Sequence, residues 1–86
     1  MKKRVQVEEV DGEGLVGLLG EVVVVWCGVY IYKGTLEGVN TDDILLTDAC
    51  VVYETGALGG KPTNTEKVPG PLYVRTQAIE CYYKAP

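Results

Sequence analysis

The stretch that decides the fold is VYIYKGTLEG, residues 29–38. Its first half alternates valine and isoleucine with tyrosine, and this period of two is typical of a β-strand. Gly34 stands in the middle of the stretch, where a glycine marks a bulge or a sharp bend. The sequence therefore predicts a strand that is bent at Gly34.

Further segments on both sides have the composition of strands, because they are rich in β-branched, apolar and aromatic residues. They are residues 21–27, 44–54, 72–76 and 77–84. Asn40 and Asp42 favour a turn before the segment 44–54, because such side chains bond to their own backbone. The chain thus has five predicted strands.

The segment 55–71, TGALGGKPTNTEKVPGP, is rich in Gly, Pro, Thr and Asn and predicts a long loop or an extended hairpin tip. Pro69 and Pro71 each lack an amide donor, so regular pairing is expected to resume only after Pro71.

Residues 12–17, GEGLVG, match the glycine pattern of a dinucleotide-binding turn, with Glu37 downstream as the acidic residue. That site needs a long helix after the turn, and strand-like residues begin at 21, so we interpret the match as coincidence. A short helix over 12–20 is predicted instead, with Leu15, Leu18 and Leu19 on one apolar face. Asp11 is a candidate N-cap, and Gly20 ends the helix.

These elements predict an all-β fold, namely a small, strongly bent, five-stranded antiparallel barrel of the SH3-like type with a short N-terminal helix. Closure into a barrel is expected because five short strands in a flat sheet would leave their edges exposed. The two strands at the end of the chain are the expected free edges. Pairing one subunit's edge with the next subunit's is a heterologous contact that can close into a ring.

The length and composition of the chain limit the class of protein. At 86 residues the chain is expected to be one domain, with an arm at 1–11, the helix at 12–20 and the barrel at 21–83. A domain of this size buries little surface, so oligomerisation is expected. No apolar run has the length of a membrane helix and no signal peptide is recognisable, so we expect a cytoplasmic protein without a membrane partner.

The formal net charge of −4 argues against binding to duplex DNA, because an acidic surface repels phosphates. Lys2, Lys3 and Arg4 form a local basic arm that either contacts nucleic acid or only solubilises the terminus.

The residue types also limit the catalytic and metal sites that the chain can form. The chain has no histidine and no serine, which removes the usual nucleophile–base pairs and the commonest metal ligand. Cys27, Cys50 and Cys81 are widely spaced and are expected to be buried thiols rather than a disulfide or a metal site. The adjacent Asp42 and Asp43 are expected in a solvated turn, since neighbours on a strand face opposite ways. We therefore expect no enzyme, no cofactor and no metal.

Two motifs resemble those of the Sm and Sm-like (LSm) family. The first is GVYIYKGTLEGVNTDDILLTDA, residues 28–49, in which Gly34 stands at the bend and the spacing from Gly34 to Ile44 is that of the bacterial RNA chaperone Hfq. The second is LYVRT followed by QAI, which is similar to the apolar-Arg-Gly motif of the family.

The resemblance implies a ring of five to seven subunits, joined by pairing of the last two strands, with single-stranded RNA bound around the pore. Arg75 takes the place of the family's stacking arginine, and Thr76 replaces the usual glycine. In the first motif the stacking position falls on Thr41 or Asp42, and neither side chain can stack on a base. Asn40 and Asp43 are the expected base-edge groups.

Two hypotheses follow. The first is a ring-forming, non-catalytic protein that binds single-stranded RNA, with contacts from Asn40, Thr41, Asp42, Asp43, Arg75 and Thr76 and a peripheral contact from the basic arm. The second is an oligomeric ring scaffold or protein-interaction module that has lost the stacking form of RNA binding. The second hypothesis is motivated by the excess of acidic over basic residues and by the missing stacking residue.

Overall fold

The computed structural model describes residues 14–54 and 64–86 of the chain. The described part is mainly β, with two 3-10 turns. The strands are β1 (Val22–Cys27), β2 (Tyr30–Val39), β3 (Asp43–Glu54), β4 (Asn64–Lys67), β5 (Leu72–Arg75) and β6 (Cys81–Lys84). The 3-10 turns are η1 (Val16–Leu18) and η2 (Thr76–Ala78). The basic arm and the candidate N-cap Asp11 lie outside the described residues.

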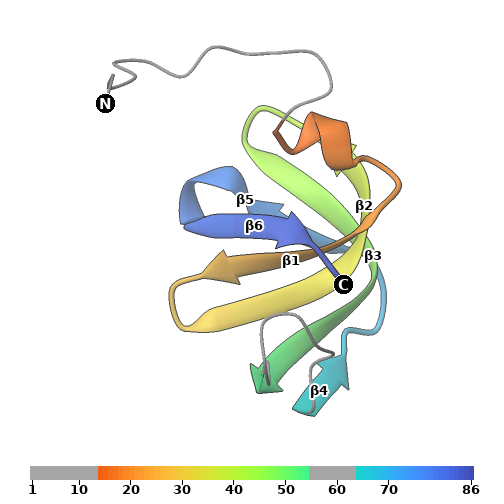
Figure 1. The fold of residues 1–86 in the computed structure, drawn as a ribbon, viewed down its shortest axis with the longest axis vertical. Helices are drawn as coiled ribbons and strands as arrows, with labels where there is room; N and C mark the ends of the chain where they lie inside the picture. Colours follow the sequence, from red (N-terminus) through yellow and green to blue (C-terminus); the bar gives the residue numbers. More distant parts are fainter. Residues whose placement is uncertain (1–13, 55–63) are drawn as a thin grey trace.

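All strands belong to one antiparallel sheet in the order β4-β3-β2-β1-β6, and β5 also pairs with β3 (Figure 1). The long strand β3 holds β5 against its first four residues and β4 against its last part. Among the described residues no pairing joins β5 to β6, so the sheet curls without closing. The expectation of an antiparallel β fold is confirmed, whereas a closed five-stranded barrel is not what the described strands form.

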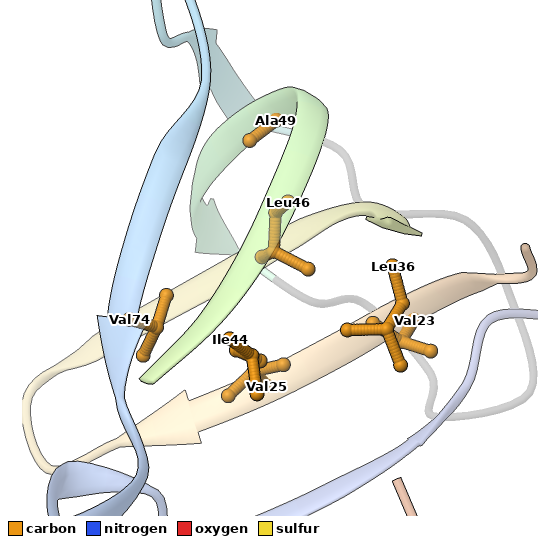
Figure 2. Close-up of a cluster of buried hydrophobic side chains, with 7 residues drawn as sticks. All are labelled: Val23, Val25, Leu36, Ile44, Leu46, Ala49 and Val74. Carbon is orange, nitrogen blue, oxygen red and sulfur yellow. The ribbon is translucent and has the colours of Figure 1, made fainter. Parts of the chain in front are cut away.

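The core lies inside this curl (Figure 2). Its side chains come from β1, β2, β3 and β5 and point toward one another: Val23, Val25, Leu36, Ile44, Leu46, Ala49 and Val74. They occupy alternate strand positions, except where β3 changes register, because neighbouring residues of a strand face opposite sides of the sheet. No polar or charged residue of the described part is buried.

The bend predicted at Gly34 is confirmed. The β2–β3 register shifts between Lys33 and Thr35, as it does at a bulge. A Cβ atom at Gly34 would lie 3.1 Å from the Cα and the Cβ of Ala49 and from the carbonyl oxygen of Thr47. The two strands therefore approach so closely here that a side chain at position 34 would push its neighbours apart by a few tenths of an ångström.

The helix predicted over 12–20 is wrong in extent, since the described part of this segment holds only the single 3-10 turn η1. Gly14 and Gly20 both have positive φ, at 69° and 86°, so at most five residues between them have helical geometry. That is too few for an α-helix to repay its nucleation. Leu15 and Leu18 pack against the core as expected, whereas Leu19 is exposed.

For residues 55–71, the alternative of an extended hairpin agrees with the antiparallel pairing of β3 and β4, whereas the expectation that pairing resumes only after Pro71 is wrong. Residues 55–63 lie outside the described residues, but β4 pairs with β3 before the prolines rather than after them. The Val68 amide continues this pairing with a 2.8 Å hydrogen bond to the carbonyl of Ala49. Pro69 and Pro71 thus interrupt the pairing along β3, and the predicted five strands become six.

The last strand is shorter than the predicted 77–84. Residues 76–78 form η2, and the chain then returns to β1 through a 2.7 Å hydrogen bond from the Glu80 amide to the Trp26 carbonyl. β6 begins at Cys81, opposite Trp26. None of the helical segments in the described ranges is long and apolar enough to cross a membrane.

The glycine pair Gly34 and Gly38 tests the close approach of β2 and β3. Gly34→Ala is expected to lower the free energy of unfolding by about 1–3 kcal/mol, because the new methyl group meets the backbone of Ala49. Gly38→Ala is the matched control on the same strand, since its Cβ would lie 3.6 Å from the Leu45 Cβ, an ordinary contact. Urea unfolding of both variants measures the difference, and equal stabilities would contradict the packing described here.

Candidate functional site

The structure brings the predicted site residues together at one corner of the sheet. Residues 40–42 form the turn between β2 and β3, and Asp43 opens β3. Arg75 ends β5 directly opposite Asp43 in the β3–β5 register, and Thr76 follows it as the first residue of η2. Two segments that are far apart in the sequence therefore form one surface, which we call the 40–76 corner (Asn40, Thr41, Asp42, Asp43, Arg75 and Thr76).

Thr76 connects the turn 40–42 to the end of β5 by hydrogen bonds. Its amide donates a 2.9 Å hydrogen bond to the carbonyl of Asp42. Its hydroxyl donates a 3.2 Å hydrogen bond to the carbonyl of Thr41, across 35 residues of sequence. A glycine at this position would make the first bond but not the second, so the threonine adds a side-chain tie to the turn.

Asn40 and Asp43 close the turn on itself. The Asn40 amide donates to the Asp43 carbonyl at 2.8 Å, and the Asn40 side-chain Nδ2 donates to the Asp43 Oδ1 at 2.9 Å. These two bonds orient both side chains, while Asn40 remains exposed and Asp43 half-buried. Within the described residues no donor reaches the Asn40 Oδ1, so it remains available as a hydrogen-bond acceptor.

Arg75 supplies the positive charge of the corner. Its side chain is exposed, and within the described residues it makes neither a hydrogen bond nor an ion pair. The ion pair of the described part joins Lys84 to Glu21 at 3.3 Å, on β6 and at the start of β1. The Arg75 guanidinium is therefore open to a ligand, although Asp42 and Asp43 lie beside it in the same corner.

A groove of about 250 Å³ begins at Arg75 and follows β5. One wall is the whole of β5, from Leu72 to Arg75, and the other is formed by Cys27, Tyr30 and Tyr32. The two tyrosine rings stack with centroids 6.3 Å apart and planes inclined by 18°. We call this feature the β5 groove; it has an aromatic wall and runs along a strand that has a partner on one side only.

Two groups in the aromatic wall, Cys27 and Tyr32, have raised pKa values, which favours their neutral forms. Burial raises the pKa of the Cys27 thiol, and the nearby Glu80 and Cys81 raise it further. Burial likewise raises the pKa of Tyr32, with smaller contributions from Cys27 and Tyr30. Arg75 is thus the charged member among the residues that line the β5 groove.

The sequence did not reveal the β5 groove. The alternation of Tyr30 and Tyr32 places both rings on one face of β2, and that much could have been derived from the pattern. The pattern could not show that β5 passes opposite these rings. The position of β5 depends on which part of β3 pairs with β5 and which part pairs with β4.

The cysteines form no joint site. All three are free thiols, and Cys27 and Cys50 are half-buried, which is close to the expectation. The expectation that Cys81 is buried is wrong, because it lies exposed on the edge strand β6. No group of three or more metal-binding side chains occurs in the described parts of the chain.

No protein-family model matches the chain, and no curated protein shows significant similarity to it. A function must therefore be inferred from the residues and their geometry.

Proposed function

We propose that this protein is a non-catalytic, ring-forming protein of the Sm-like kind that binds single-stranded RNA at the 40–76 corner. The observation that carries the proposal is the joining of residues 40–43 to residues 75–76 by the two Thr76 hydrogen bonds and the β3–β5 pairing. Those are the two segments from which the sequence resemblance expects the RNA contacts.

Arg75 is the central RNA contact in this proposal. An exposed guanidinium that no other described residue holds can stack on the face of a base and attract the phosphate next to it. The Oδ1 of the exposed Asn40 accepts a hydrogen bond from a base edge, and the bond from Asn40 Nδ2 to Asp43 holds the side chain in place. Since Thr41 and Asp42 cannot stack, each subunit contributes one stacking group, and appreciable affinity requires several subunits.

The free strand edges allow several subunits to assemble. Among the described strands β5 pairs with β3 alone and β6 with β1 alone, so each has one row of backbone groups that no described strand pairs with. The β5 groove lies along the first of these edges and offers an apolar, aromatic wall to an added strand. Exposed Tyr82 on β6 is an aromatic side chain that suits this wall. Addition of β6 from one copy to β5 of the next is heterologous and closes into a ring.

A second candidate function is favoured by the acidic residues of the corner. Asp42 is exposed, and a ring repeats it once in each subunit. Concentrated negative charge repels phosphates and favours a basic protein partner instead. In this alternative the chain forms the same ring but acts as a scaffold for protein binding.

The proposed assembly predicts a native mass well above that of one chain. At about 50 μM we expect light scattering to give a single species at a multiple of 9.3 kDa, because each added subunit buries a free edge. Tyr82→Lys is expected to shift the mass toward 9.3 kDa, since a lysine on an edge strand opposes strand addition.

Val16→Lys is the matched control for this prediction. It adds the same charge at a residue that is 59% exposed in η1, which belongs to neither edge strand, and should leave the mass unchanged. A folded wild-type protein that stays at 9.3 kDa would contradict the ring.

The RNA contact predicts a graded loss of binding at position 75. Arg75→Ala is expected to weaken binding of a short oligo-uridine at least tenfold, because stacking contributes about 1–3 kcal/mol per base and the charge is lost as well. Arg75→Lys keeps the charge but loses the planar stacking group, so its affinity should lie between those of the wild type and Arg75→Ala. Fluorescence anisotropy over a salt series measures all three proteins.

Thermal unfolding is the control for these variants. Since the Arg75 side chain has no partner in the described part of the chain, both substitutions should change the free energy of unfolding by less than about 0.5 kcal/mol. An assembled wild-type ring that does not bind oligo-uridine at low salt would exclude RNA binding and leave the scaffold function.

A further inference from the structure

A second cavity lies on the face of the sheet opposite the core and shares no lining residue with the 40–76 corner or the β5 groove. It has a volume of about 350 Å³ and is lined by residues of β1, β2, β3 and β4: Val22, Lys33, Gly34, Thr35, Asp48, Cys50 and Thr65. Lys33 and Thr35 flank the buried Gly34, so their side chains face away from the core. We call this feature the outer cavity.

Two lysines share one cross-strand row, and the first of them, Lys33, lines this cavity. The register places Lys33 opposite Cys50 on one side, and Lys67 opposite Cys50 on the other. Residues directly opposite in an antiparallel pair point to the same face, with Cβ atoms about 4.5–5.5 Å apart. Lys67 therefore stands beside the lined wall of the cavity, one strand beyond Cys50.

Neither ammonium group is neutralised within the described residues. The ion pair found there joins Lys84 to Glu21, and neither Lys33 nor Lys67 makes a side-chain hydrogen bond. Residues two strands apart in one row are about 10 Å apart at the backbone, so an anion fits between the ends of the two lysine side chains. In a chain of net charge −4, this placement of two unpaired cations points to an anionic ligand.

Hydroxyl donors complete the arrangement. Thr35 on β2 and Thr65 on β4 both line the outer cavity. A phosphate group carries about −1.5 to −2 charges and three acceptor oxygens, so two ammonium groups and two hydroxyls match its needs. A carboxylate has fewer acceptor positions and a smaller charge.

Asp48 is the opposing group at this site. It lines the cavity with an exposed carboxylate, and its backbone has a positive φ of 49°. With Lys33 and Lys67 the local charge is still +1, so attraction of an anion survives. Asparagine adopts positive φ readily, which makes Asp48→Asn a gentle way to remove the carboxylate.

We propose that the outer cavity binds a phosphate group between Lys33 and Lys67, with the hydroxyls of Thr35 and Thr65 as further donors. This site is separate from the 40–76 corner and does not depend on ring formation or on RNA binding there. The phosphate can belong to a nucleic-acid backbone or to a small phosphorylated molecule, and the chemistry of recognition is the same.

Titration with inorganic phosphate at constant ionic strength, followed by amide NMR shifts, tests the proposal. We expect saturable shifts at residues 33–35, 50 and 65 with a dissociation constant of about 1–10 mM. Lys33→Gln and Lys67→Gln should each weaken binding about fivefold, because each removes one charge-assisted contact at a partly exposed site. Asp48→Asn should strengthen it by a similar factor.

Lys84→Gln is the matched control, since it removes the same charge at a residue already paired with Glu21. It should leave phosphate binding unchanged. If Lys33→Gln disturbs folding, the exposed Lys67 still provides the test. Shifts that do not saturate, or that persist equally in Lys33→Gln and Lys67→Gln, would overturn the proposal.

Uridine 5′-monophosphate and a short oligo-uridine distinguish the two sources of phosphate. Tighter binding of the oligonucleotide at the same amides, lost with Lys67→Gln but kept with Arg75→Ala, indicates a nucleic-acid backbone. Equal binding of the mononucleotide and inorganic phosphate indicates a small phosphorylated molecule. Loss of binding with Arg75→Ala alone would show that phosphate binds at the corner and not in the outer cavity.

Discussion

The close approach of β2 to β3 at Gly34 and Ala49 is the constraint on which the rest of the structure depends. With 3.1 Å between a hypothetical Gly34 Cβ and Ala49, the strands pack without an intervening side chain, and their register shifts at this point. The shift lets β3 curl, as Figure 2 shows, so that its first part faces β5 and its last part faces β4. Val74 of β5 can then cover Ile44 and close the core.

The same curl creates both candidate binding surfaces. On the inner side it carries β5 to the turn between β2 and β3, where Thr76 bonds to the carbonyls of Thr41 and Asp42. On the outer side it opens the sheet around the bulge, where Lys33 and Asp48 line one cavity. Asp48 has a positive φ because β3 must change register between Thr47 and Cys50 while it keeps Ala49 inside.

Much of this architecture was predictable from the sequence, and the limits have physical reasons. Period-two alternation and the glycine in residues 29–38 predict the bent strand, since both depend on the segment alone. The partners of β4 and β5 depend on where β3 bends, and no local pattern records that. The tetrapeptide Asn64–Lys67 is polar and exposed, so its pairing leaves no hydrophobic signal. The approach of Arg75 to Asp43 was expected from the resemblance of two motifs. The β5 groove and the row of Lys33 and Lys67 could be recognised only once the strand pairing was known.

In the proposed ring, strand β5 would link assembly to ligand binding. One side of its four residues is held by β3, the other side borders the β5 groove, and its last residue is Arg75. A strand held on one side only keeps part of its backbone motion, and that motion extends to the side chain at its end. Pairing of the open side with a second copy fixes the backbone of β5 and so reduces the conformational entropy that Arg75 must lose on binding. If assembly occurs at this edge, it therefore raises the affinity of each corner as well as the number of corners.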